Sequence, residues 1–221
     1  MKKIVSMIVL FMASVILFAQ QDVTQFLGIP VDGTKSAMIQ KLKAKGFQYN
    51  STFDQLEGEF NGSQVYLSIV TDNNKVWRIV VRDVVPMSES QIKIRYNKLC
   101  NQFLNNKKYM PASLEYKLSD DEDISYEISV HDKQYQAPFY QIPTDSTSIV
   151  TYGLEKIKQT YTEEEIVNLT EEEQQSFVFN VYFELLSKKL VWFTISKELS
   201  RGYIIVMYYD NEYNHANGED L

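Results

Sequence analysis

Aromatic side chains and carboxamides gather near the end of the chain, where an alternating stretch predicts the last β-strand. The candidate ligand-binding residues there are Tyr209, Asp210, Asn211, Tyr213, Asn214 and Asn217. An aromatic ring offers an apolar face and a carboxamide offers both a donor and an acceptor, so this mixture suits recognition of a sugar or a peptide. A second interpretation also fits, in which the alternating tyrosines belong to the strand and the rest is a polar C-terminus.

Residues for nucleophilic catalysis are scarce. The chain has two histidines, His131 and His215, and no Gly-x-Ser-x-Gly motif accompanies them to present a nucleophilic serine. The sequence also contains no glycine-rich phosphate loop. We therefore expect no catalytic residue and no cofactor. A carboxylate pair for glycoside hydrolysis stays open as an alternative, because a sequence does not report the distance between two carboxylates.

The acidic tail from Asp210 begins like a calcium-binding loop. Its sixth position is His215 instead of glycine, and its twelfth is Leu221 instead of glutamate, so the motif is incomplete. The glutamates at 163–165 and 171–173 follow threonines that open helices, where carboxylates interact favourably with the helix dipole. We expect no metal site.

Composition excludes several classes of protein. The 221 residues include 22 Lys and Arg against 29 Asp and Glu, which gives a net charge of -7. An acidic surface repels nucleic acid and anionic lipid, so neither is an expected partner. Cys100 is the single cysteine and forms no internal disulfide; its helical neighbours predict that it is a buried apolar residue.

Residues 1–20 are typical of a signal peptide. Lys2 and Lys3 precede a largely apolar run from Ile4 to Phe18, which is short for a membrane-spanning helix. Cleavage after Ala19 would export the protein to the periplasm or the extracellular space, with no membrane span left. An uncleaved N-terminal anchor is the alternative interpretation.

Residues 21–86 predict a helix followed by a four-strand meander. Thr34 is the expected N-cap of the helix and Gly46 its C-terminal stop. The expected strands are Phe47 to Phe53, Leu56 to Phe60, a strand through Val65, Leu67 and Ile69, and Val76 to Val85. Asn61-Gly62 is the two-residue turn that closes the central hairpin.

Residues 87–221 predict a second α+β unit, continuous with the first in one globular body. A capping box of Ser88 and Gln91 opens a helix that runs to about Asn106. Strands are expected at Leu114 to Leu118, Ile124 to His131, Gln134 to Ile142, Leu190 to Ser196 and Tyr203 to Tyr209, and helices after Thr162 and Thr170. The fold class is therefore α+β, with an antiparallel meander sheet and helices on one face. This order is compatible with a degenerate tandem repeat.

Two resemblances accompany these patterns. The segments Phe26–Pro30, Asp32–Ser36, Tyr208–Asn211 and Asn217–Leu221 resemble small secreted proteins of unknown function from Gram-negative gut bacteria. This resemblance implies export and brings no activity. Helix followed by a four-strand meander is also similar, in pattern only, to β-lactamase-inhibitor-like domains, which are interaction modules.

Together these observations favour a non-catalytic binding or interaction protein outside the cytoplasm. The expected partner is a protein of the envelope or the extracellular space, or a glycan, bound on an aromatic patch that the helices leave uncovered. A small secreted hydrolase and a structural component of the envelope are the alternatives. The sequence leaves the oligomeric state open.

Overall fold

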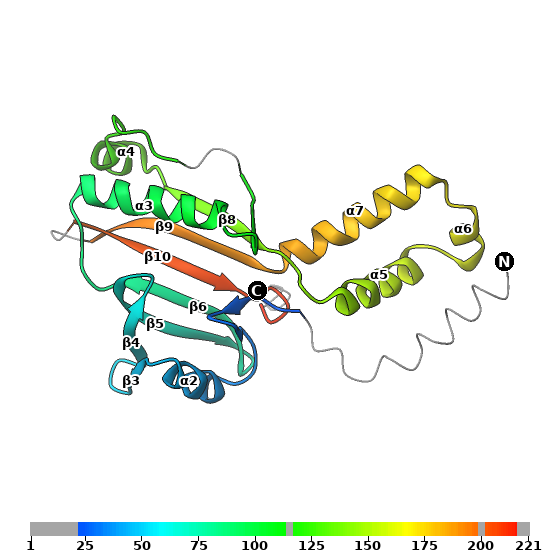
Figure 1. The fold of residues 1–221 in the computed structure, drawn as a ribbon, viewed down its shortest axis with the longest axis horizontal. Coiled ribbons are helices and arrows are strands. Elements are labelled where there is room, and N and C mark those ends of the chain that lie inside the picture. The colour runs from blue at the N-terminus through cyan, green and yellow to red at the C-terminus, as the bar shows by residue number, and fades with distance from the viewer. Residues whose placement is uncertain (1–21, 114–116, 199–201, 216–221) are drawn as a thin grey trace. The chain divides into compact units, whose positions relative to one another are not determined.

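A computed structural model describes residues 22–113, 117–198 and 202–215 (Figure 1). Contacts within the chain group these residues into two compact units. The helical unit contains Asp22 and Pro143–Leu186, and the sheet unit contains Val23–Ile142 and the chain from Ser187 onward. The expected signal peptide at residues 1–20 lies outside the described residues.

The sheet unit is built on one eight-stranded antiparallel sheet. Its strands, in spatial order, are β3 (Gln48–Asn50), β4 (Gln55–Phe60), β5 (Ser63–Asp72), β6 (Lys75–Asp83), β10 (Gly202–Asp210), β9 (Leu190–Glu198), β8 (Gln136–Gln141) and β7 (Tyr109–Pro111). Two four-strand meanders therefore meet where β6 pairs with β10. A small hairpin of β1 (Gln25–Phe26) and β2 (Ile29–Pro30) precedes the sheet.

Each meander follows a helix in the sequence. Helix α2 (Lys35–Ala44) precedes β3, and helix α3 (Glu89–Leu104) precedes β7. The predicted α+β class with a meander sheet is confirmed. The predicted division after residue 86 falls between β6 and α3. The strands before it and the strands after it belong to the same sheet.

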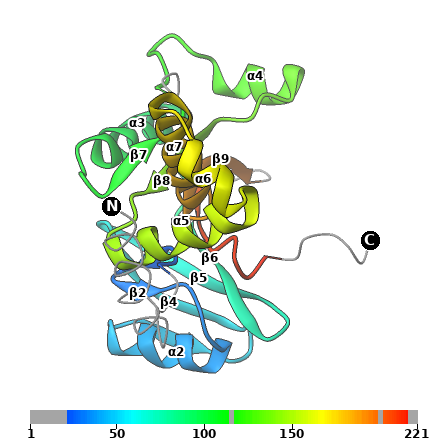
Figure 2. The same ribbon diagram turned by 90° about the vertical axis from the view of Figure 1, so that its right-hand side faces the viewer.

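Both helices cover the same face of the sheet. Leu67, Val81, Met207 and Phe193 lie side by side on four neighbouring strands, and all belong to one buried core. The α2 and α3 residues of that core include Met38, Leu42, Ile92, Tyr96, Leu99 and Phe103. Figure 2 shows α2 beside the strands of the first meander, where it contacts β5 and β6. We call the opposite side of the sheet the open face.

Local sequence signals explain where these elements begin and turn. The Ser88 and Gln91 side chains form the expected capping box at the start of α3, and the Thr34 side chain accepts a hydrogen bond at the start of α2. Asn61 and Gly62 both have positive φ (53° and 74°), as a two-residue hairpin turn requires.

The helical unit lies in the sequence between β8 and β9. It contains α5 (Ser146–Thr160), α6 (Glu163–Asn168) and α7 (Glu171–Ser187). The expected capping boxes form at Thr162 with Glu165 and at Thr170 with Glu173. Helix α5 was not expected from the sequence.

One predicted strand is wrong. Ile124–His131 forms helix α4, because the Asp123 side chain accepts a hydrogen bond from the Tyr126 amide and so caps the first turn. The Glu89 side chain on α3 accepts a second hydrogen bond, from the Ile124 amide. The predicted strand from 114 to 118 falls largely on residues outside the described part of the chain.

Within residues 22–113, 117–198 and 202–215, no helix combines the length and the apolar character needed to cross a bilayer.

Candidate functional site

The predicted ligand-binding residues divide between the interior and the open face. Tyr209 faces the helix-covered core, where its ring lies 4.8 Å from the ring of Phe26 in an edge-on contact. Burial raises the pKa of the Tyr209 hydroxyl well above its usual value. Asn217 lies outside the described residues.

The amides after β10 hold this segment to the rest of the sheet unit. The buried Asn211 side chain donates a hydrogen bond to the Val31 carbonyl (2.7 Å) and accepts one from the Tyr213 amide (3.1 Å). Asn214 donates to the Val76 carbonyl (2.9 Å) and to the Asp32 carboxylate (2.7 Å). In this structure these carboxamides make hydrogen bonds within the chain.

Asp210 is the predicted residue that faces the open side of the sheet, next to Arg78 on the paired strand β6. Its side chain is 1% exposed. The Arg78 guanidinium donates two hydrogen bonds to it, from Nε to Oδ1 (2.6 Å) and from Nη2 to Oδ2 (2.7 Å). The Trp192 indole donates a third, from Nε1 to Oδ2 (2.9 Å). A buried carboxylate requires such compensation, and a two-pronged guanidinium contact provides it with fixed geometry.

Three aromatic rings also lie close to the Arg78 guanidinium. The guanidinium carbon lies 4.2 Å from the ring centroid of Trp77, 4.9 Å from that of Tyr208 and 5.8 Å from that of Trp192. Trp192 and Tyr208 stack on each other at 4.0 Å with an interplanar angle of 16°. We call Trp77, Arg78, Trp192, Tyr208 and Asp210 the Arg78 cluster. Its cation–π contacts and hydrogen bonds hold the rings in place.

A β-bulge places two neighbouring residues of β6 in this cluster. Arg78 pairs with Val70 and Val76 pairs with Thr71, so Trp77 is the extra residue on its strand. A bulge of this kind re-aims a side chain, which explains why both Trp77 and Arg78 reach the same cluster. The Trp77 carbonyl is held by the Asn211 amide at 2.7 Å.

A groove of about 370 Å³ lies beside the cluster on the sheet unit. Trp192 and Tyr208 line it together with polar side chains from β8, β9 and the segment after α4. Its described lining residues are Ile128, Asp132, Lys133, Gln134, Gln136, Trp192, Thr194, Ile195, Ser196, Lys197, Val206 and Tyr208. The groove therefore combines stacked aromatic rings with carboxamides, hydroxyls and two lysines.

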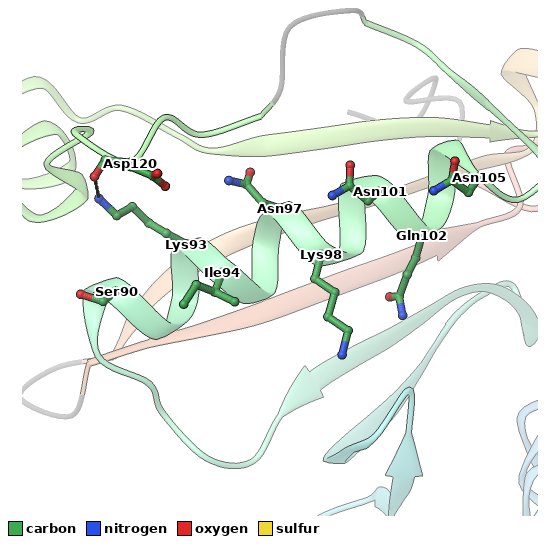
Figure 3. A pocket seen from close by; sticks show the side chains of 9 residues that line it. All are labelled: Ser90, Lys93, Ile94, Asn97, Lys98, Asn101, Gln102, Asn105 and Asp120. Carbon is green, nitrogen blue, oxygen red and sulfur yellow. Dashed lines mark hydrogen bonds between the residues drawn. The ribbon is translucent and has the colours of Figure 1, made fainter.

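A larger hollow, of about 920 Å³, lies along the outer side of α3 (Figure 3). The Asn97 carboxamide there is already used, because it donates to the Leu118 carbonyl (2.8 Å) and accepts from the Leu118 amide (2.9 Å). Lys93 reaches the backbone carbonyl of Asp120 (2.7 Å). None of the nine described lining residues is aromatic. This hollow is typical of the solvated side of an amphipathic helix, so the open-face groove is the stronger candidate site.

The remaining groups with catalytic potential have structural contacts of their own. The second buried carboxylate, Asp83, is bound by the Arg95 guanidinium at 2.7 and 2.5 Å. His131 is exposed beside Glu127, and His215 lies beside Glu212 with its ring 4.3 Å from the ring of Trp77 in the Arg78 cluster. Cys100 is buried as expected, and burial raises the pKa of its thiol to about 12. Among the described residues, no group of three or more His, Cys, Asp or Glu could hold a metal ion.

Sequence reasoning identified Asp210 but missed Trp77, Arg78 and Trp192. These residues come from strands separated by more than a hundred residues in the sequence, and the pairing of β6 with β10 brings them together. One signal was available: the chain has only two tryptophans, and both belong to this cluster. Comparison with known protein families, curated proteins and solved structures finds no match.

Proposed function

We propose that this protein is an exported, non-catalytic binding protein whose open face binds a glycan in the groove beside the Arg78 cluster. The observation that carries the proposal is the stacked pair of Trp192 and Tyr208 at the wall of a polar groove. Aromatic rings give an apolar contact to the C–H faces of a sugar, and amides or hydroxyls pair with its hydroxyl groups. Export is supported by the leader-like residues 1–20.

The rigidity of the cluster supports a binding role. Trp192 is fixed by its hydrogen bond to Asp210 and by its stack on Tyr208. A ring that is already ordered loses little conformational entropy when a ligand docks on it, so pre-organisation favours affinity. The groove volume of about 370 Å³ lies at the lower end of the range for ligand pockets, which fits a short segment of a glycan.

Polar groups suited to hydroxyl recognition lie within the same groove. The Gln136 carboxamide donates to Gln134 Oε1 at 2.8 Å, which leaves further donor and acceptor positions on both amides. Thr194 and Ser196 add hydroxyls from β9. Together with the stacked rings, these groups provide the combination that carbohydrate recognition needs.

A binding role without catalysis is favoured over the hydrolase alternative. A glycosidase needs two carboxylates that flank the scissile bond. Of the described residues that line the groove, Asp132 is the one acidic side chain. The buried Asp210 carboxylate beside the groove accepts hydrogen bonds from Arg78 and Trp192.

Binding can be tested with a glycan array followed by titration of any glycan that binds. Gln136→Ala removes a groove amide, and we expect it to weaken binding about 10-fold, the loss that corresponds to one or two net hydrogen bonds. Gln64→Ala is the matched control, because Gln64 is an exposed glutamine on β5 outside the groove lining. The proposal is wrong if no glycan binds, or if both variants bind a glycan as tightly as the parent protein does.

A further inference from the structure

The outer side of α7 exposes large apolar side chains. Val178 is 64% exposed, Phe179 67% and Phe183 47%. The rings of Phe179 and Phe183, one helical turn apart, stack with their centroids 6.2 Å apart. A contiguous exposed aromatic patch on a protein surface is a common sign of an interaction site. We call Val178, Phe179 and Phe183 the α7 patch.

The α7 patch is separate from the side of α7 that packs within the helical unit. Phe177 makes an edge-on contact with Tyr161, and Val181 approaches Gly153 of α5. Glu184 accepts hydrogen bonds from α5, where Lys156 approaches it at 2.8 Å. With 3.6 residues per turn, these contacts lie on one side of α7 and the patch lies on the other.

The charge of the helical unit indicates the chemistry of a partner. Residues 143–186 contain nine Asp and Glu against two Lys, a net charge of -7. Glu171 and Glu172 lie in the first turn of α7. Glu172 is seven residues before Phe179 and therefore on the same side of the helix. The patch is thus an apolar surface with carboxylates at one end.

We propose that the α7 patch binds a cationic amphipathic segment of a partner protein. The apolar side of that segment would cover Phe179 and Phe183, and its Lys or Arg residues would lie near Glu171 and Glu172. Charge complementarity favours a cationic partner segment over a second copy of this chain and over an anionic lipid surface. A second copy of the chain would bring like charges together, and an anionic lipid surface would be repelled.

A defined peptide can test this interface on the purified protein. The probe is an 18-residue amphipathic helix of Leu and Lys, labelled for fluorescence anisotropy, and the matched control replaces every Lys by Glu. We expect the Leu–Lys peptide to bind with an affinity that falls as salt rises, because exposed charges are screened. We expect the Leu–Glu peptide not to bind.

Variants then locate the contact. Phe179→Ala with Phe183→Ala should weaken peptide binding at least 10-fold, as loss of central aromatic anchors does in other interfaces. Val167→Ala is the matched control, since Val167 is 83% exposed on α6. Glu171→Gln with Glu172→Gln should reduce the salt dependence, whereas Glu163→Gln with Glu164→Gln should leave it unchanged. Circular dichroism checks that each variant is folded.

Three results would overturn the proposal. The Leu–Lys peptide could fail to bind, it could bind the double phenylalanine variant as tightly as the parent, or sedimentation could show a dimer that Phe179→Ala dissociates. Each outcome leaves the proposed glycan site untouched, because that site lies on the sheet unit and is read out with a different ligand.

Discussion

Replacing Arg78 by methionine should destabilise the sheet unit strongly. The Asp210 carboxylate is 1% exposed, and Arg78 provides two of the three hydrogen bonds that its side chain receives. Methionine keeps the apolar stem of the side chain but leaves the buried Asp210 carboxylate with one hydrogen-bond donor, the Trp192 indole. Breaking a buried ion pair in this way costs about 3–5 kcal/mol of unfolding free energy.

Arg82 provides a matched control four residues along the same strand. Its guanidinium donates to Glu198 at 2.8 Å, but its side chain is 44% exposed, against 24% for Arg78. An ion pair in contact with solvent contributes about 0–1 kcal/mol. Arg82→Met should therefore lower the free energy of unfolding by less than about 1 kcal/mol.

Urea unfolding followed by tryptophan emission measures this difference. Both tryptophans lie in the sheet unit, so their emission reports the unfolding of that unit alone. A double-mutant cycle with Asp210→Asn gives the coupling energy between the two side chains. Equal losses for Arg78→Met and Arg82→Met, or a coupling energy below about 0.5 kcal/mol, the level at which independent sites add, would refute the reasoning.

Three further predictions follow from local chemistry. Because burial raises the pKa of Cys100 to about 12, its thiol should resist a disulfide reagent at pH 8 and react once urea unfolds the protein. Gly202 has a φ of 109°, and a Cβ there would meet a backbone carbonyl. Gly202→Ala should therefore destabilise the protein more than Gly62→Ala, because a Cβ at Gly62 meets no atom and costs only about 1–2 kcal/mol for its left-handed backbone. Thermal melts of the two variants compare these losses. The hydrogen bond from Lys133 lowers the pKa of Glu122 in the folded protein. The ionised Glu122 therefore stabilises the fold fully above the pKa that it has in the unfolded chain, and this stabilisation is lost as the pH falls through the lower pKa of the folded state. Glu122→Gln should flatten that part of the stability–pH profile, and an unchanged profile would contradict this.

The elements with strong local signals could be predicted from the sequence. The capping box at Ser88, the turn at Asn61-Gly62 and the stop at Gly46 each depend on a few neighbouring residues, and the structure confirms these helices and strands. Helix α5 carried weaker signals. It opens with β-branched residues and contains Gly153, both of which lower helix propensity.

Helix α4 shows how tertiary contacts override an alternating pattern. The sequence Ile-Ser-Tyr-Glu-Ile-Ser-Val-His alternates as a strand does, yet Ile124 and Ile128, four residues apart, both contact the core. Asp123 caps the first turn and Glu89, 35 residues earlier, binds the Ile124 amide. That second contact depends on the placement of α3, so local propensity could not reveal it.

The candidate site was only partly accessible to sequence reasoning for the same reason. Asp210 stood out because it lies among aromatic and amide residues at the end of a predicted strand. Trp192 lies on β9, the hairpin neighbour of β10. Arg78 is 132 residues from Asp210 and depends on strand pairing between distant segments, and Trp77 joins it through a β-bulge. A local pattern predicts where a strand ends but not which strand lies beside it.

The central claim is that the open-face groove beside Trp192 is the ligand-binding surface. With two tryptophans in the chain, an amide-correlation NMR spectrum contains two indole N–H signals, and the Trp192 indole donates to Asp210. Titration with a glycan that binds should shift the Trp192 indole signal in proportion to the bound fraction, and Gln136→Ala should shift the titration midpoint about 10-fold higher. A glycan that binds the protein while both indole signals remain unchanged would contradict the account.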